Sequence, residues 1–352
     1  MDENLLVSIN KESKSTNSPL IYFNVEVRNN TAEPQPFKVD LATGEIISNN
    51  AQSYCVGIQR ASLPGTEIPI TTIDRGLFVT LTDGDVPVSR EVQYLNRESK
   101  YGKNTVFSYQ EIATCLSNAM KEANDNLTTP TALPPFVYFS PQTAIFYICL
   151  PIEYDEIQTP GTQYKLFYNT KLQSMFPNYE TKFYGYNNGF QNFQIICDEG
   201  FGINLSAKSG GTNLRVPEGY VEVSQEYSAP YLLQKYIAVV FRSTKIGVQN
   251  EYIPPPNNSN QLAQNSTSGV SNSDAILTDV IPILDDSAGT RAGIYYAPPQ
   301  VRWIPIQKNT IDRIDMNVTL RDTVGEEIDY YIPPYQTGKI KLVFGLEGYI
   351  QQ

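Results

Sequence analysis

The chain has 352 residues, of which 41% are hydrophobic and 18% are charged, so it can bury a large core. Acidic residues outnumber basic ones by 37 to 26, giving a formal charge of −11, and no lysine- and arginine-rich block offers a phosphate-binding arm. Histidine is absent, which excludes Ser-His-Asp and Cys-His nucleophile systems and histidine-ligated zinc. We therefore predict no direct nucleic-acid binding, no enzyme activity and no cofactor.

Residues 1–19 are expected to form an N-terminal arm. They contain no basic start followed by an apolar core, so no signal peptide is predicted. No apolar run reaches the roughly 18 residues that would span a bilayer, so no membrane span is predicted either. The four cysteines are far apart and form no CxxC pair, which indicates buried free thiols rather than a metal site.

Strand-like segments dominate the chain after the arm. Residues 20–28 alternate apolar and polar side chains, which is typical of a strand with one buried face. Residues 53–63 are small and apolar on both faces, as in a strand covered on both sides. Further candidate strands are separated by proline and glycine, at 77–81, 91–95, 136–140, 143–150, 191–197, 236–241, 276–284 and 301–306. This pattern predicts an all-β sandwich or barrel.

One segment has helical periodicity instead. Ser108 and Glu111 fit the S-x-x-E capping box, in which each side chain satisfies the other residue's free backbone N–H. The following apolar residues recur at the spacing of one helix face: Ile112, Cys115, Leu116, Ala119, Met120 and Ala123. We predict an amphipathic helix over 108–124 that covers one end or flank of the sheet.

Two segments interrupt the strand pattern. Residues 247–275 are rich in proline, asparagine and serine with few apolar anchors, which predicts a flexible loop. A tyrosine- and glycine-rich stretch begins after residue 150, and we interpret 151–235 as an insertion domain. The β core would then consist of a first part, 20–150, and a second part, 236–352.

Closely spaced carboxylates make "TDGD" (82–85) and "LDDSAG" (284–289) the best candidates for a metal site. Asp83 and Asp85 could supply oxygen ligands to calcium. The same sequence is typical of a solvated Asp-Gly turn between strands, which is the commoner role. The 24 tyrosines have two interpretations as well, because they could line the β core or supply contact area at an interface.

The last hundred residues contain the most regular strand pattern. Alternate residues from Ile314 to Leu320 are apolar, and those between them, such as Asp315, are polar. A turn signal at 324–326 precedes a second run, "GKIKLVFG" (338–345). We predict a terminal hairpin whose apolar face closes a sandwich and whose polar face is wet.

Three stretches together resemble the penton and minor capsid proteins of virophages and Polinton-like DNA viruses. They are "YCVGIQRASLPGTEIPI" (54–70), the helix at 108–124 with the following "VYFSPQTAIFYI" (137–148), and the terminal strands with their "RDTVGEE" turn (321–327). The resemblance implies a single eight-stranded jelly roll, giving as fold class an all-β jelly-roll sandwich with one amphipathic helix and an inserted β-rich region. It also implies a homopentamer at the five-fold vertices of an icosahedral virion, with the major capsid protein as partner and synthesis in the host cytoplasm.

Three alternatives stay open at this stage. About sixteen candidate strands exceed the eight of one jelly roll, so two tandem jelly rolls, as in a trimeric major capsid protein, compete with one jelly roll plus an insertion. A carbohydrate-binding viral spike or adhesin would account for the tyrosines and acidic turns. A β-sandwich hydrolase using two distant carboxylates is the third reading, although no spacing identifies such a pair.

Overall fold

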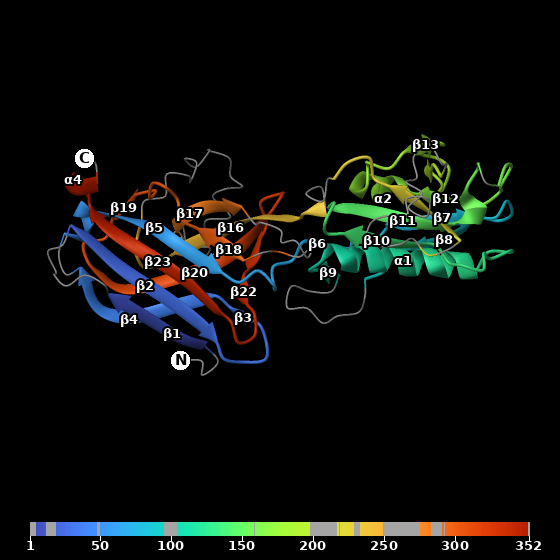
Figure 1. Ribbon diagram of the computed structural model, residues 1–352. Coiled ribbons are helices and arrows are strands. Elements are labelled where there is room, and N and C mark those ends of the chain that lie inside the picture. The colour runs from blue at the N-terminus through green and yellow to red at the C-terminus, as the bar shows by residue number, and fades with distance from the viewer. Residues whose placement is uncertain are drawn as a thin grey trace, which may run out of the picture. The chain divides into compact units, whose positions relative to one another are not determined.

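The computed structural model describes residues 5–11, 19–47, 50–94, 104–157, 159–197, 217, 219–228, 233–248, 275–282, 291 and 293–350. The chain divides into two compact units (Figure 1). Unit 1 combines three segments, Met1–Ile68, Tyr236–Leu284 and Arg291–Gln352, and unit 2 is formed mainly by Pro69–Lys235. Between Ile68 and Tyr236 the chain leaves unit 1, builds most of unit 2, and returns.

Unit 1 is a sandwich of two antiparallel sheets. The first sheet has the order β1-β2-β23-β5-β18, with β19 also paired to β5. Its strands are β1 (Leu5–Lys11), β2 (Leu20–Asn29), β23 (Thr337–Leu346), β5 (Tyr54–Leu63), β18 (Ile294–Tyr296) and β19 (Ile304–Pro305). The second sheet has the order β17-β16-β20-β21, with β4 also paired to β20. Its strands are β17 (Ala275–Pro282), β16 (Tyr236–Ser243), β20 (Ile311–Asp322), β21 (Glu327–Asp329) and β4 (Lys38–Ile47).

The strand order is that of a jelly roll. The eight jelly-roll strands, numbered one to eight along the chain, are β2, β4, β5, β16, β17, β18, β20 and β23. In the first sheet they lie in the order one-eight-three-six, which is β2-β23-β5-β18. In the second sheet they lie in the order two-seven-four-five, which is β4-β20-β16-β17. The first strand thus pairs with the eighth, the second with the seventh, the third with the sixth and the fourth with the fifth. This is a long hairpin rolled into two sheets, and it confirms the predicted fold class.

Apolar side chains on the facing sides of these sheets form the core of unit 1. The alternation predicted for residues 20–28 is present, since Ile21, Phe23, Val25 and Val27 are all buried. Phe23 meets Phe344 of β23 edge to face, with ring centroids 5.6 Å apart. The predicted inward face of β20 is buried too, with Val318 and Leu320 fully inaccessible.

The predicted terminal hairpin is wrong in one respect. β20 and β23 are both core strands, but they lie in opposite sheets, and β23 pairs with β2 and β5. The intervening chain forms the short strands β21 and β22 (Tyr331–Ile332), and β22 pairs with β3 (Gln35–Pro36). Sequence spacing cannot distinguish a hairpin from a crossover between two packed sheets, because both place an apolar face on the same core.

Part of the N-terminal arm is a strand. β1 pairs antiparallel with β2 over its full length, from Leu5 opposite Asn29 to Lys11 opposite Phe23. It extends the first sheet beyond the eight jelly-roll strands and forms its edge. At the other end of the described chain, the short helix α4 (Glu347–Ile350) follows β23 directly.

Unit 2 has its own architecture. A three-stranded sheet contains β10 (Phe136–Ser140), β11 (Ile145–Pro151) and β15 (Tyr220–Ser224). A five-stranded sheet contains β13 (Thr181–Phe183), β14 (Phe193–Ile195), β12 (Lys165–Tyr168), β7 (Phe78–Thr82) and β8 (Val88–Glu91). The short strands β6 (Thr71–Thr72) and β9 (Thr105–Val106) pair separately, and helix α2 (Thr170–Met175) follows β12.

Helix α1 (Tyr109–Asp125) organises the core of unit 2. The predicted capping box is confirmed, because Ser108 Oγ accepts from Glu111 N and the Glu111 carboxylate accepts from Ser108 N. The predicted apolar stripe is buried and packs against β10 of one sheet and β7 of the other. The helix therefore covers the sheets of the inserted unit, whereas we expected it on the jelly roll.

The domain boundaries differ from those drawn from the sequence. We placed 20–150 in the core and 151–235 in the insertion, whereas the contacts assign Pro69–Lys235 to unit 2. Residues 69–150 contain good strands, but those strands pair with β12, β15 and one another within unit 2. An alternating sequence pattern shows that one face of a strand is buried, but it does not show which other strand pairs with it. Most of the predicted loop 247–275 lies outside the described residues.

Candidate functional site

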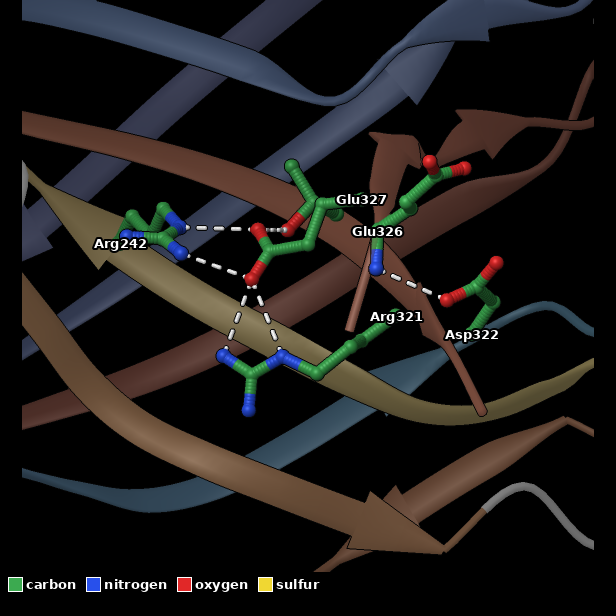
Figure 2. A network of polar contacts seen from close by, with 6 residues as sticks. Arg242, Arg321, Asp322, Glu326 and Glu327 are labelled. Carbon is green, nitrogen blue, oxygen red and sulfur yellow. Dashed lines mark hydrogen bonds and ion pairs between the residues drawn. The ribbon is translucent and has the colours of Figure 1, made fainter. Parts of the chain in front are cut away.

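A charged network ties three strands of the second sheet together, and Figure 2 shows Glu327 of β21 held between two arginines. Arg242 of β16 donates to both Glu327 oxygens, at 3.0 and 2.7 Å, and Arg321 of β20 donates to Oε1 at 3.1 and 2.9 Å. Thr319 Oγ1 adds a third donor, 2.7 Å from Oε2. Burial acts to raise the pKa of Glu327, but the hydrogen bonds from Arg242, Thr319 and Arg321 outweigh it, so the pKa is lowered.

The network is a structural clamp. An ionised carboxylate engaged by two guanidinium groups is a poor proton acceptor, so Glu327 is unsuited to acid–base catalysis. The adjoining turn is fixed by Asp322 Oδ1, which accepts from the backbone N–H of Val324. It also accepts from the backbone N–H of Glu326 (Figure 2). Arg242 and Glu327 lie 85 positions apart, and no sequence signal connects them.

A second carboxylate, Asp315, is buried on the face of β20 that we predicted to be wet. Its side chain accepts four hydrogen bonds of 2.5–2.8 Å, from Ser243 Oγ, Thr244 N, Thr244 Oγ1 and Lys245 N. The chain that continues from β16 folds back over this position and covers it. Alternation correctly places Asp315 opposite the core, but it cannot show that another segment covers that outer face.

The loops at one end of unit 1 are joined across long sequence separations. Asn29 at the end of β2 donates to the carbonyl groups of Ile332 and Pro333, 3.1 Å away in each case. Tyr330 Oη donates to Pro64 O at 2.7 Å, next to the point where the chain leaves unit 1. These contacts hold the first, third and last long strands of the jelly roll in register at that end.

Unit 2 contains a buried acid in a different environment. Glu222 of β15 is 1% exposed, and it accepts a 2.6 Å hydrogen bond from Tyr138 Oη while its Oε1 has no partner. Cys149 lies opposite it on β11, and the rings of Tyr138 and Tyr147 stack at 5.0 Å. Burial raises the pKa of Glu222, and the hydrogen bond from Tyr138, which acts to lower it, does not compensate.

Unit 2 also exposes a cluster of aromatic side chains at the turn between β13 and β14. Phe183, Tyr184, Tyr186 and Phe190 are between 40% and 70% exposed. Phe183 packs edge-on against Tyr186, with centroids 4.8 Å apart, and Phe190 stacks on Phe78 at 3.9 Å. We call these four residues the aromatic hairpin. Exposed apolar groups gathered in this way mark contact surfaces.

The predicted metal candidates are used within a turn. Asp83 Oδ1 accepts from Asp85 N at 3.2 Å, and Asp83 Oδ2 accepts from Thr129 N at 2.6 Å. Gly84 between them has φ of +101°, as a tight Asp-Gly turn requires. Across the part of the chain that the structure describes, no three Cys, Asp or Glu side chains converge as metal ligands. The calcium hypothesis for Asp83 and Asp85 stays a prediction, and residues 284–289 lie outside the described part. The four cysteines are buried thiols that form no disulfide bond, as predicted.

The jelly roll is an architecture shared by viral capsid proteins, lectin domains and cupins, so the fold narrows the class of protein without deciding it. The family model for the Sputnik minor capsid protein V18/19 matches residues 82–345, which is most of the chain and spans both units. The chain belongs to this family of minor capsid proteins. Its place is therefore in the virion, within a capsid that contains other capsid proteins, and the resemblance found in the sequence is confirmed.

Two solved structures share the fold. The mavirus penton protein is 15% identical, with a TM-score of 0.65 over 92% of this chain and 99% of that one. A chain from the cryo-electron microscopy structure of the Sputnik virophage is 18% identical, with a TM-score of 0.65 over 99% of both chains. No curated protein matches the sequence. Within the described residues, no helix is both long and apolar enough to cross a bilayer.

Proposed function

We propose that this minor capsid protein is a penton, five copies of which close each five-fold vertex of an icosahedral DNA-virus capsid beside the major capsid protein. The observation that carries the proposal is the single jelly roll. A double-jelly-roll major capsid protein needs a second jelly roll. The described residues of unit 2 have a different strand order and do not form one. The fold shared with the mavirus penton protein supports the same role.

The mass of the purified chain in solution tests this proposal. Light scattering behind a sizing column should give a species near five times 39.5 kDa. A trimer would contradict the penton role and favour a major capsid protein or spike. A monomer that still fails to assemble after addition of the major capsid protein would contradict it too.

We further propose that the role is structural, without catalysis and without direct binding of nucleic acid, and that the protein is made in the host cytoplasm. The composition supports the first two points, since the chain lacks histidine and carries a formal charge of −11. Retention of a DNA duplex by the purified protein at physiological salt would contradict the second point. Fractionation of infected host cells, with newly made subunits outside the cytoplasm, would contradict the third.

A second function is favoured by the aromatic hairpin. We propose that it contacts carbohydrate on the host cell, because exposed Tyr and Phe rings offer flat faces for sugar rings, and the side-chain amides of Asn188 and Gln191 lie in the same turn. A glycan array should give binding by the wild type, at least tenfold weaker for Tyr186→Ala. Tyr335→Ala, which removes a similarly exposed tyrosine from unit 1, is the control. An array without hits would exclude this function and leave the penton role intact.

A further inference from the structure

The outer face of the first sheet carries an excess of positive charge on an acidic chain. Antiparallel partners share a face, so Lys341 points outward beside Arg60, and Lys339 points outward beside Glu26. Arg28 adds a further cation near the end of β2. On β2, β23 and β5, four described cations and one described acid thus face outward, while the whole chain has a formal charge of −11. We call Arg28, Arg60, Lys339 and Lys341 the basic face.

The strands β2, β23 and β5 lie side by side (Figure 1), and a groove of about 470 Å³ lies over their outer face and that of β18. That volume is within the range of sites that hold small ligands. Three members of the basic face line it: Arg60, Lys339 and Lys341. The rest of its polar lining consists of the Glu26 carboxylate, the Asn24 amide, the Ser62 hydroxyl and Tyr295. The groove therefore combines cations with hydrogen-bonding groups and an aromatic ring.

These groups are accessible to a ligand. Arg60 is exposed and has no ion-pair partner among the residues that the structure describes. The Lys339 side chain is 62% exposed, and its 3.3 Å contact with Glu26 is a surface ion pair of the kind that contributes little to stability. Tyr295 is 67% exposed. A ligand in the groove can therefore reach the charges and the ring without displacing a buried group.

The groove is short along the strands. At one end, the segment that leads into β19 covers the outer face of the sheet, because a Cβ added at Gly57 would collide with Val301 and with the Arg302 carbonyl. Trp303 of the same segment lies directly against Gly345. The basic face therefore ends at this segment, and it does not continue in that direction as a track for a long polyanion.

We propose that the groove binds an acidic saccharide, a sugar chain that carries sulfate or carboxylate groups. The guanidinium of Arg60 can hold such an oxyanion through two parallel hydrogen bonds, and the two lysines add charge. The hydroxyl groups of a sugar both donate and accept hydrogen bonds, and Glu26, Asn24 and Ser62 offer the matching acceptors and donors. Tyr295 presents a flat face against which a sugar ring can pack. The inference is independent of the penton role, and it places in unit 1 a site distinct from the aromatic hairpin of unit 2.

Glu26 favours a saccharide over a nucleic acid as the occupant. A carboxylate in the groove repels phosphate groups, and a DNA backbone has no hydroxyl group that could donate to it. A sugar can donate a hydroxyl group to Glu26 while its acidic groups contact the cations. Sulfate and carboxylate groups accept from the same donors, so the test includes both.

Binding of short oligosaccharides to the full-length chain, measured by calorimetry, tests the site. The probes are a heparin hexasaccharide for sulfate, a galacturonic acid hexamer for carboxylate and maltohexaose as the neutral sugar. At least one acidic probe should bind, with maltohexaose at least tenfold weaker, and Lys339→Gln/Lys341→Gln should weaken the acidic probe at least tenfold. The control Lys121→Gln/Lys245→Gln removes the same charge from exposed lysines elsewhere and should stay within about twofold of wild type. Thermal melting checks that each variant is folded.

Glu26→Ala separates a saccharide site from a surface that binds any anion. The substitution should weaken the acidic probe at least threefold, because it removes an acceptor for sugar hydroxyl groups. A site that works by charge alone should instead bind more tightly once an acid is removed. Tyr295→Ala should weaken binding by a similar factor, whereas Tyr186→Ala in the aromatic hairpin should have no effect.

Three results would overturn the inference: no binding of either acidic probe, a lysine pair with no more effect than its control, or tighter binding by Glu26→Ala. Loss of binding in Tyr186→Ala alone would locate the saccharide on unit 2 instead. A single-stranded DNA oligomer that binds more tightly than both acidic sugars, and that Lys339→Gln/Lys341→Gln releases, would identify a nucleic-acid site and overturn the inference too. None of these results depends on the oligomeric state, so the penton role would stand in each case.

Discussion

The two units of this chain place their strand partners at very different distances along the sequence. In unit 1, β2 pairs with β23, so residues near position 20 depend on residues near position 345. In unit 2, the elements that pack together all lie between Pro69 and Lys235. Their buried acids differ as well, since Asp315 has four hydrogen-bond donors while Glu222 has one donor and a free oxygen. In unit 1, residues about 70 positions away in the sequence supply the hydrogen bonds to the buried Asp315 carboxylate. In unit 2, the buried Glu222 carboxyl keeps one oxygen without a hydrogen-bond partner.

The largest expected effect would break unit 1 alone. Val318→Asp places a carboxylate in the fully buried inner face of β20, where an unpaired charge costs several kcal/mol, about the net stability of a domain. We expect the jelly roll to unfold while the core around α1 keeps its protection in hydrogen exchange followed by mass spectrometry.

Val324→Asp is the matched control, because Val324 is 79% exposed in the nearby turn and should tolerate the charge. A soluble Val318→Asp protein with full protection in both units would contradict the placement of this face. Loss of hydrogen-exchange protection in both units together would show that unit 2 cannot stay folded without unit 1. The two units would then not differ in the way that we describe.

A smaller loss is expected from Asp315→Ala. The substitution leaves the donors from Ser243, Thr244 and Lys245 without their acceptor, which should cost about 3 kcal/mol of unfolding free energy. Denaturant unfolding of unit 1 measures the change. The exposed acid three positions earlier gives the control, and Asp312→Ala should stay within about 0.5 kcal/mol of wild type. Equal effects of the two substitutions would show that Asp315 is solvated.

The charged network predicts a pH dependence for unit 1. The pKa of Glu327 is lowered, so its contribution is present above the ordinary glutamate value and is lost as the pH falls through the lowered value. Glu327→Gln should cost about 1–2 kcal/mol at neutral pH and flatten this acid-side loss. Unfolding of both proteins between about pH 3 and pH 7 tests the sign. An unchanged acid slope in the variant would rule Glu327 out as its source.

The smallest effect is expected in unit 2, and it has the opposite sign. Because the pKa of Glu222 is raised, the folded state binds its proton more tightly than the unfolded chain does. The stability of unit 2 should therefore decrease as the pH rises from the ordinary glutamate value through the raised one. Glu222→Gln should remove this slope, with a net change below about 1 kcal/mol at acidic pH. A unit 2 that becomes more stable over the same rise in pH would contradict this reading.

Features set by neighbouring residues were predictable from the sequence. The capping box of α1, the alternation in β2 and the apolar inner face of β20 depend on side chains a few positions apart, and the structure confirms all three. The wet outer face predicted for β20 is wrong at Asp315, which is buried. Features set by distant residues were not. The start of unit 2 at Pro69, the sheet to which β23 belongs and the arginine partners of Glu327 each depend on which segments meet in three dimensions.

The pairing of β2 with β23 also has a consequence for the order of events during synthesis. On the ribosome, β2 emerges early with β1 as its neighbour on one edge, but its other edge has no partner until residues 337–346 have been made. The segment from Pro69 to Lys235 is synthesised before β23, so unit 2 can fold while the jelly roll still lacks its last strand. During that interval β2 exposes an unpaired edge and an apolar face. That edge and that face stay exposed to other chains until the final strand of the jelly roll is in place.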